Sequence, residues 1–205
     1  MYNSQQFLDM TPQVHGACGH RRHGVLLALG ANMSGAWGSP CETLARAQRE
    51  LAMAGLHTLR ASPLYATSPL GPGRQAPYVN AVLQVQASLA PGALLRLVKR
   101  IERRAGRRFG PHWGPRCLDI DVLDFGGRRL GWPARRRERG RLILPHPEMH
   151  LRAFVLVPLL EVDRHWRHPA LGSAGRALLG RLIPSSRRHM RRILDFAEFA
   201  CDKGD

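Results

Sequence analysis

Two aspartates separated by a single residue stand in the segment Trp113–Phe125, which reads WGPRCLDIDVLDF. Apolar residues recur at every second position through its latter half, and this period predicts a β-strand. Asp119 and Asp121 then share one face of the strand, about 7 Å apart along the backbone, whereas Asp124 points to the other face. Two carboxylates so close repel each other unless a cation lies between them, and Mg²⁺ takes carboxylate oxygens together with phosphate oxygens. The alternative is an edge strand whose acids are simply solvated.

An arginine stands three residues before the first aspartate, at the end of the turn Gly114-Pro115-Arg116. A guanidinium group binds phosphate through two parallel hydrogen bonds, so this residue suits the same ligand as the paired acids. The tryptophan, the stiff turn and the arginine together favour a cation and phosphate site over a solvated edge strand.

The whole chain is strongly basic, with a formal net charge of +16 over 205 residues, and all but two of its 31 basic residues are arginines. This balance favours an anionic partner, either a nucleotide or a nucleic acid. No apolar run approaches the roughly 20 residues that cross a bilayer, and the N-terminal residues lack the apolar core of a signal peptide. We therefore expect a cytoplasmic protein with no membrane partner. We also expect a monomer. The four cysteines fit no zinc or redox spacing, which predicts reduced thiols.

Periodicity predicts alternating strands and helices around the paired acids. Ser39, Pro40 and Glu42 have the spacing of a helix N-terminus with a capping box, and Gly55 ends that helix. Further strands are expected at Val25–Gly30, Leu56–Thr67 and Tyr78–Gln86, and further helices at Pro91–Gly106, Ser173–Ile183 and Arg187–Phe199.

Three segments of the chain resemble a known family, in the family's order. WGPRCLDIDVL is similar to the signature of the 6-hydroxymethyl-7,8-dihydropterin pyrophosphokinases. TSPLGP followed by QAPYVNA, within residues 67–81, resembles the family's second motif, and RLILPHPEMHLRAFVLVPL resembles its third. The turn Gly30-Ala31-Asn32-Met33 resembles one that shapes the floor of the family's pterin site. The resemblance covers about Val25–Val162.

The resemblance implies an α+β, ferredoxin-like sandwich whose mainly antiparallel sheet carries packed helices. It also implies transfer of pyrophosphate from ATP, the co-substrate, to 6-hydroxymethyl-7,8-dihydropterin in folate biosynthesis, with release of AMP. On this match Asp119 and Asp121 hold two Mg²⁺ ions, and Arg107, Arg116, Asp119 and Asp121 are catalytic. ATP is bound by Glu102, Arg116, Arg141, His146 and Arg152. The pterin is bound by Asn80, Tyr78, Trp113, Phe154, Leu70 and Gly71.

The loop before the signature departs from the family pattern. Residues 107–112 read RRFGPH, which is one residue shorter than the common family loop, a mobile and catalytically important segment. Either Arg107 or Arg108 can therefore take the place of the catalytic loop arginine, and His112 stands where the family often has an arginine. Glu102 faces the nucleotide by resemblance, although a salt bridge to a neighbouring arginine explains a helical glutamate equally well.

Domain organisation follows from the extent of the resemblance. We expect an unfolded extension over residues 1–23, a pyrophosphokinase domain over 24–183 with a basic insertion at about 128–140, and a basic helix or tail over 184–205. The insertion and the tail also suit a nucleic-acid-binding protein on the same fold, and the shortened loop suits an inactive paralogue. Paired acids inside a basic surface favour the enzyme.

Overall fold

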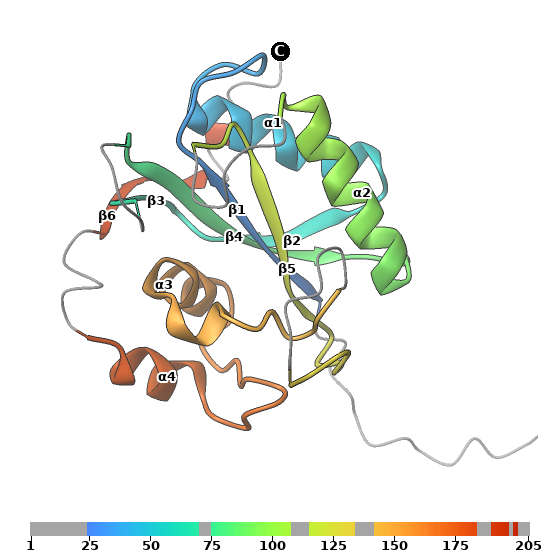
Figure 1. Ribbon diagram of the computed structural model, residues 1–205, viewed down its shortest axis with the longest axis vertical. Helices are drawn as coiled ribbons and strands as arrows, with labels where there is room; N and C mark the ends of the chain where they lie inside the picture. Colours follow the sequence, from blue (N-terminus) through green and yellow to red (C-terminus); the bar gives the residue numbers. More distant parts are fainter. Residues whose placement is uncertain are drawn as a thin grey trace, which may run out of the picture.

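The computed structural model describes residues 24–69, 75–107, 115–133, 142–183, 190–196 and 199–200. Within them a sheet has the strand order β5-β1-β4-β3-β6, with β2 also paired to β4, and each pairing is antiparallel. Helices α1 and α2 lie on one side of this sheet and α3 and α4 on the other (Figure 1). The strands are β1 (Val25–Ala31), β2 (His57–Ala61), β3 (Leu64–Thr67), β4 (Tyr78–Gln86), β5 (Asp119–Phe125) and β6 (Met190–Leu194). The helices are α1 (Pro40–Met53), α2 (Pro91–Arg104), the 3₁₀ helix η1 (Met149–Leu151), α3 (Ala153–Val162) and α4 (Gly175–Arg181). The predicted α+β architecture is confirmed.

Helix α1 begins and ends where the sequence predicts. The Ser39 backbone N–H donates to Glu42 Oε2 at 2.9 Å, and the Ser39 hydroxyl accepts from the Glu42 N–H at 3.4 Å. Gly55 follows the last turn with φ +83°, a left-handed conformation that favours glycine. No helix among the described residues is long and apolar enough to cross a membrane.

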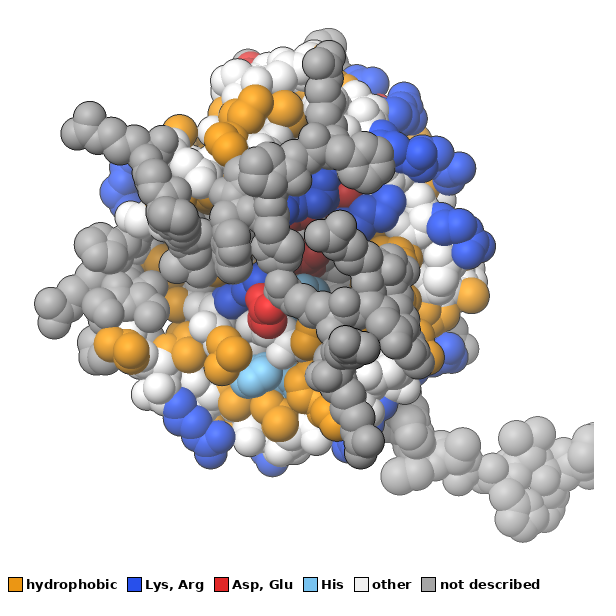
Figure 2. Space-filling view, viewed as in Figure 1, with side chains coloured by type: hydrophobic (Ala, Val, Ile, Leu, Met, Phe, Trp, Pro, Cys, Tyr) orange, Lys and Arg blue, Asp and Glu red, His pale blue; other side chains and the backbone are white. Residues whose placement is uncertain are grey.

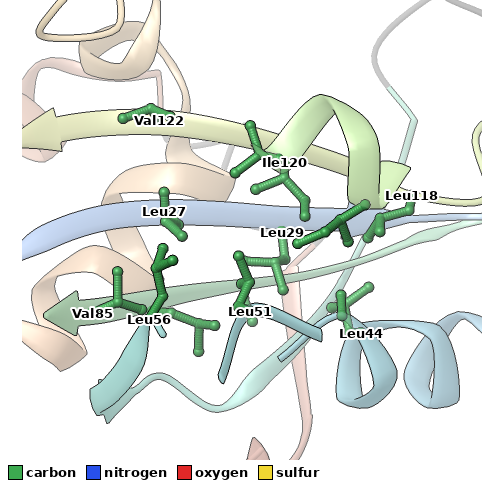
Figure 3. Packing of buried hydrophobic residues seen from close by; sticks show 14 of the residues in the cluster. Leu27, Leu29, Leu44, Leu51, Leu56, Val85, Leu118, Ile120 and Val122 are labelled. Atoms are coloured by element: carbon green, nitrogen blue, oxygen red, sulfur yellow. The ribbon is translucent and has the colours of Figure 1, made fainter. Parts of the chain in front are cut away.

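The two faces of the sheet are covered unequally. Alternate residues of β1, β4 and β5, including Leu27, Leu29 and Ile120, form the larger core with α1 and α2 (Figure 3). On the opposite face Leu26 and Val82 pack with α3 and α4, but this smaller core ends before the sheet does. Toward the end of that face the strands carry small or polar residues instead, and a cavity opens there.

A proline interrupts the strand predicted at Leu56–Thr67. Pro63 has no N–H to donate to a neighbouring strand, so the segment divides into β2 and β3. The Ser62 hydroxyl accepts from the Val82 N–H at 2.9 Å and replaces the ladder hydrogen bond that the interruption removes.

The helix predicted at Arg187–Phe199 is wrong, because Met190–Leu194 forms strand β6. Its residues pair with the edge of β3, for example Thr67 with Met190. The unpaired backbone groups of that edge outweigh the local helix preference of the segment.

A β-bulge in β5 corrects the predicted direction of Asp124. Leu27 pairs with Val122 but the adjacent Leu26 pairs with Asp124, so one residue of β5 is extra. The extra residue shifts the alternation, and Asp124 turns to the α3 and α4 face together with Asp119 and Asp121.

The first part of the predicted basic insertion is anchored to the fold. Leu130 and Leu144 exchange two backbone hydrogen bonds, of 2.9 and 2.8 Å. The Trp132 ring lies 6.1 Å from that of His150 and 5.4 Å from that of His168. The insertion's residues 134–140, the extension 1–23 and most of the tail lie outside the described residues, so the domain boundaries stay predictions.

Candidate active site

A cavity of about 140 Å³ opens on the α3 face of the sheet, where the smaller core ends. Strands β1, β4 and β5, helix α3 and the residues that flank them contribute its walls. Its lining includes Ala28, Leu29, Gly30, Thr67, Ser68, Tyr78, Asn80, Ala81, Arg116, Asp119, Asp121, Arg152, Phe154 and Val155. The structure thus brings together nine of the side chains predicted for the site, when His146 and Arg107 beside the lining are included.

One transverse row of the sheet carries the centre of the cavity. Gly30 of β1 pairs with Asn80 of β4 on one side and with Asp119 of β5 on the other. Paired residues of neighbouring strands point to the same face, so Asn80 and Asp119 flank a position that has no side chain. A Cβ atom on Gly30 would lie 3.1 Å from Asn80 Oδ1, so the glycine leaves the cavity space above this residue unfilled.

The Asn80 side chain is held in a defined orientation. Only 7% of the residue is exposed, and its Nδ2 donates to Thr67 Oγ1 at 2.8 Å. The amide oxygen remains beside Gly30, where it can accept a hydrogen bond from a bound heterocycle. Tyr78 and Phe154 also line the cavity, and the Arg152 guanidinium lies 5.7 Å from the Phe154 ring centre.

Both carboxylate oxygens of Asp119 contact guanidinium groups. Arg107 Nη1 lies 2.6 Å from Oδ1, and Arg116 Nη1 lies 3.3 Å from Oδ2. Burial alone would raise the pKa of Asp119, but Arg107, Arg116 and Lys99 outweigh it, so the pKa of this carboxyl lies below its usual value. Figure 2 shows acidic side chains near the middle of this surface with basic side chains around them.

Asp121 has a guanidinium and an imidazole as neighbours, both at longer distances. Arg152 Nη1 and His146 Nε2 each lie 3.9 Å from its Oδ2, beyond hydrogen-bonding distance. Arg152 also forms an ion pair with Glu148 one turn away. Burial lowers the pKa of His146, and the negative charge of Asp121 only partly offsets this effect. The imidazole is therefore neutral near pH 7.

Glu102 lies behind the cavity and not among its lining residues. It is 1% exposed, and its carboxylate accepts from the Ile120 N–H at 2.8 Å, from Lys99 at 2.7 Å and from Arg107 at 2.6 Å. Burial raises its pKa, and the two cations oppose that rise only in part. Of the two roles expected for Glu102, the ion pair is therefore present, with lysine and arginine both as partners.

Asn32 has a role that the sequence motifs do not predict. Its Oδ1 accepts from the Arg116 N–H at 2.7 Å, and its Nδ2 donates to Ala76 O at 3.3 Å and Gln75 Oε1 at 3.4 Å. This single side chain ties the turn after β1 to the segments before β4 and β5. Its place in the family-like turn was a signal, although the turn alone does not say what the amide contacts.

Four predicted site residues lie outside the described residues: Leu70, Gly71, Trp113 and Arg141. Arg108 and His112 lie outside them as well, so the choice between Arg107 and Arg108 is informed only by the contacts of Arg107. Those contacts bring Arg107 to Asp119, the first of the paired acids, and to Glu102.

The donor set fits a hard divalent cation. Asp119 and Asp121 supply oxygen atoms to the same cavity, and Mg²⁺ is usually bound by one or two carboxylates plus water and substrate phosphates. Among the residues that the structure describes, no group of three or more His, Cys, Asp or Glu forms a preassembled cage. The phosphate oxygens of a substrate would have to complete the coordination.

Comparison with known proteins agrees with this geometry. The model of the family described as 7,8-dihydro-6-hydroxymethylpterin-pyrophosphokinase matches residues 26–164, which is more than half of the chain. The chain belongs to this pyrophosphokinase family. A pyrophosphokinase of Synechocystis is 38% identical over 151 residues, covering 73% of this chain and 71% of that protein. One from Haemophilus influenzae is 37% identical over 137 residues, covering 66% and 79%.

Solved structures support the fold of this pyrophosphokinase domain. A Plasmodium falciparum HPPK-DHPS variant superposes with a TM-score of 0.61 at 14% identity, over 85% of this chain and 49% of that one. The chain therefore spans about half of that two-part protein. At this identity the likeness bears on the fold alone, and it agrees with the predicted ferredoxin-like arrangement.

Proposed function

We propose that this cavity carries out the reaction of its family, the transfer of pyrophosphate from ATP to 6-hydroxymethyl-7,8-dihydropterin with release of AMP. The observation that carries the proposal is the row Asn80–Gly30–Asp119 across three strands. A hydrogen-bonding amide and a carboxylate that binds cations border the same small floor. A heterocycle at one end would hold its hydroxyl near phosphates at the other.

The pterin would lie on the Asn80 side of the floor. Asn80 offers its amide oxygen to an N–H on the ring edge, since its nitrogen is committed to Thr67. Tyr78 and Phe154 supply aromatic surface beside it, and such surfaces favour offset or edge-on contact with a flat ring. The family resemblance adds Trp113, Leu70 and Gly71 to this half.

The phosphate chain of ATP would lie on the Asp119 side. Asp119 and Asp121 would hold Mg²⁺, with two ions expected from the family, and the bound metal would neutralise phosphate charge. Arg107, Arg116 and Arg152 face the phosphates as bidentate donors, and neutral His146 can donate one hydrogen bond. Arg141 joins them by resemblance, while Glu102 acts from behind.

The chemistry asked of the side chains is mainly positioning. The pterin hydroxyl oxygen forms a bond to the β-phosphorus of ATP as the bond from that phosphorus to the α–β bridging oxygen breaks. AMP leaves, and the hydroxyl proton is released to solvent. Asn80 and the aromatic residues orient the attacking group, and the arginines hold the phosphorus in line and stabilise its developing charge. We keep cytoplasmic location and a monomeric state as predictions of this proposal.

An AMP-release assay with ATP, Mg²⁺ and the pterin alcohol tests the function. The wild-type chain should release AMP only when all three are present. Asp119→Asn should abolish most of this activity, while Asp195→Asn, a half-exposed aspartate in an ion pair with Arg192, should retain it. A wild-type chain that releases no AMP, although folded, would overturn the proposal.

A further inference from the structure

Glu102 has the environment of a buried anchor for a cation. The carboxylate is almost fully shielded from water, and the Ile120 N–H, a fixed donor of β5, keeps it in place. An ionised carboxylate at such a position must keep cationic partners, because a buried unpaired charge is strongly destabilising. Lys99 provides one partner and Arg107 provides the other.

Arg107 bridges two carboxylates through one nitrogen. Its Nη1 lies 2.6 Å from Glu102 Oε2 and 2.6 Å from Asp119 Oδ1. A divalent cation that binds Asp119 needs an oxygen of the same carboxylate, and Arg116 already contacts the other oxygen. Arg107 and the cation therefore compete for Asp119, whereas Glu102 is not reached from the cavity.

We propose that Glu102 is a positioning residue for pyrophosphate transfer, which retains Arg107 at the edge of the cavity when Asp119 exchanges that arginine for a divalent cation. The inference rests on the proposed function, because it requires Asp119 to bind the metal. After the exchange the guanidinium keeps Glu102 as its partner and turns its remaining N–H groups toward the phosphates. Glu102 thus acts on the reaction through Arg107 and does not contact ATP.

A positioning role and a nucleotide-binding role predict different kinetic effects of a substitution at Glu102. A positioning residue that acts through Arg107 should alter the chemical step more than ground-state binding of the nucleotide. A direct ATP contact should alter nucleotide affinity instead. Competition for Asp119 adds a second signature, since removal of Arg107 should leave the carboxylate more available to a cation.

Glu50 provides a matched control on α1. It is also almost fully buried, at 3% exposed, and it pairs with two arginines, Arg46 at 3.0 Å and Arg104 at 2.7 Å. It does not line the cavity, and its arginines differ from Arg107 and Arg116, which form the ion pairs of Asp119. Glu50→Gln should therefore lower stability as Glu102→Gln does, but leave the single-turnover rate within twofold.

The first experiment measures single-turnover AMP formation and, separately, the affinity for Mn²⁺ with α,β-methylene ATP by calorimetry. We expect Glu102→Gln to slow the chemical step by about tenfold or more and to change the affinity by less than threefold. In an Arg107→Ala background the same substitution should add less than twofold. Weaker analogue binding at an unchanged rate, or multiplicative loss in the double variant, would overturn the inference.

The second experiment does not alter the buried glutamate. Mn²⁺ binding to the full chain, followed by electron paramagnetic resonance of the free ion, should be several-fold tighter in Arg107→Ala than in wild type. Unchanged or weaker binding would exclude competition for Asp119. Asp119→Asn distinguishes the two levels of failure: if it does not weaken Mn²⁺ binding, the metal assignment itself is wrong.

Discussion

Strand β5 turns three aspartates to one face of the sheet, and its two ends provide them with different partners. At the amino end Asp119 contacts the guanidinium groups of Arg107 and Arg116 beside the cavity. Toward the carboxyl end Asp124 is 4% exposed and accepts hydrogen bonds from the Gly127 N–H at 2.8 Å and the Trp166 indole at 2.9 Å. Cations on long side chains surround the first carboxylate, and neutral donors fixed by the fold hold the second.

A buried histidine packs against the tryptophan that donates to Asp124. His168 packs against Trp166 with ring centres 5.6 Å apart, is fully buried, and accepts the Ala170 and Leu171 N–H groups on Nδ1. Burial, together with His150 nearby, lowers the pKa of His168 to about 4. The comparison teaches that burial alone does not distinguish a functional carboxylate. The distinguishing feature is a set of partners that can be exchanged for a substrate or a cation.

The largest expected effect separates Asp121 from Asp124. Asp121→Asn should reduce AMP release by about 10² to 10⁴-fold, because a carboxylate ligand for the cation is lost, while the free energy of unfolding stays within about 0.5 kcal/mol. Asp124→Asn should instead cost about 2 kcal/mol in urea unfolding, since the amide nitrogen faces an N–H donor. Activity per folded molecule should change less than threefold. Equal activity losses in the two variants would remove the distinction.

The next effect is a pH dependence of stability centred on His168. An unfolded histidine takes up a proton near pH 6.5, whereas folded His168 does so only near pH 4, so the unfolded state binds more protons between these values. The free energy of unfolding should therefore be highest above about pH 6.5 and should decrease as the pH drops toward 4. His168 should account for at most about 3 kcal/mol of this decrease.

Urea unfolding from pH 7 to pH 4 measures this loss. His168→Asn keeps an acceptor for the two backbone N–H groups and should flatten the pH profile. Exposed His165→Asn should leave the profile unchanged, and it is the control for histidine removal in general. A His168→Asn profile as steep as that of wild type would contradict the cause assigned here.

The smallest effect concerns Asn32, near the amino end of β5. Its neutral side chain holds the Arg116 backbone in place, whereas the ion pairs of Asp119 nearby can be exchanged. Asn32→Ala should raise the KM for the pterin alcohol by roughly three- to tenfold, because the Arg116 turn and the segment at Ala76 lose their common hydrogen-bonding partner. Gln48→Ala, which removes a 3.3 Å hydrogen bond to Thr58 away from the cavity, is the control. Steady-state kinetics at varied pterin concentration measures the KM. A wild-type KM in both variants would show that Asn32 does not affect pterin binding.

Local rules accounted for much of the fold and for the placement of Asp119 and Asp121 beside one cavity. The Ser39 capping box depends on neighbours three residues apart, and the same-face position of Asp119 and Asp121 follows from strand period alone. The family resemblance then named residues of distant segments, such as Asn80 and Arg152, that line the same cavity as these acids. These are the parts of the molecule in which sequence spacing determines geometry.

The features that the sequence did not predict depend on contacts between distant segments. Strand β6 exists because β3 offers it an edge, and the turn of Asp124 toward Trp166 depends on a bulge against β1. The shielding of Glu102 requires α2 to lie across β5, which brings its carboxylate to the Ile120 N–H. None of these juxtapositions has a signal within the short window that periodicity reads.

Because Asn80, Gly30 and Asp119 form one row across three strands, backbone pairing fixes the distance between Asn80 and Asp119. Two inter-strand steps of about 4.8 Å separate the outer residues, and hydrogen-bonded ladders stretch very little. Side-chain substitutions at Asn80 or Asp119 can change how tightly a ligand is bound there, but they do not change the distance between the two positions. Under the proposed function, we therefore expect that an acceptor whose hydroxyl stands on a longer tether would overshoot the phosphates of ATP.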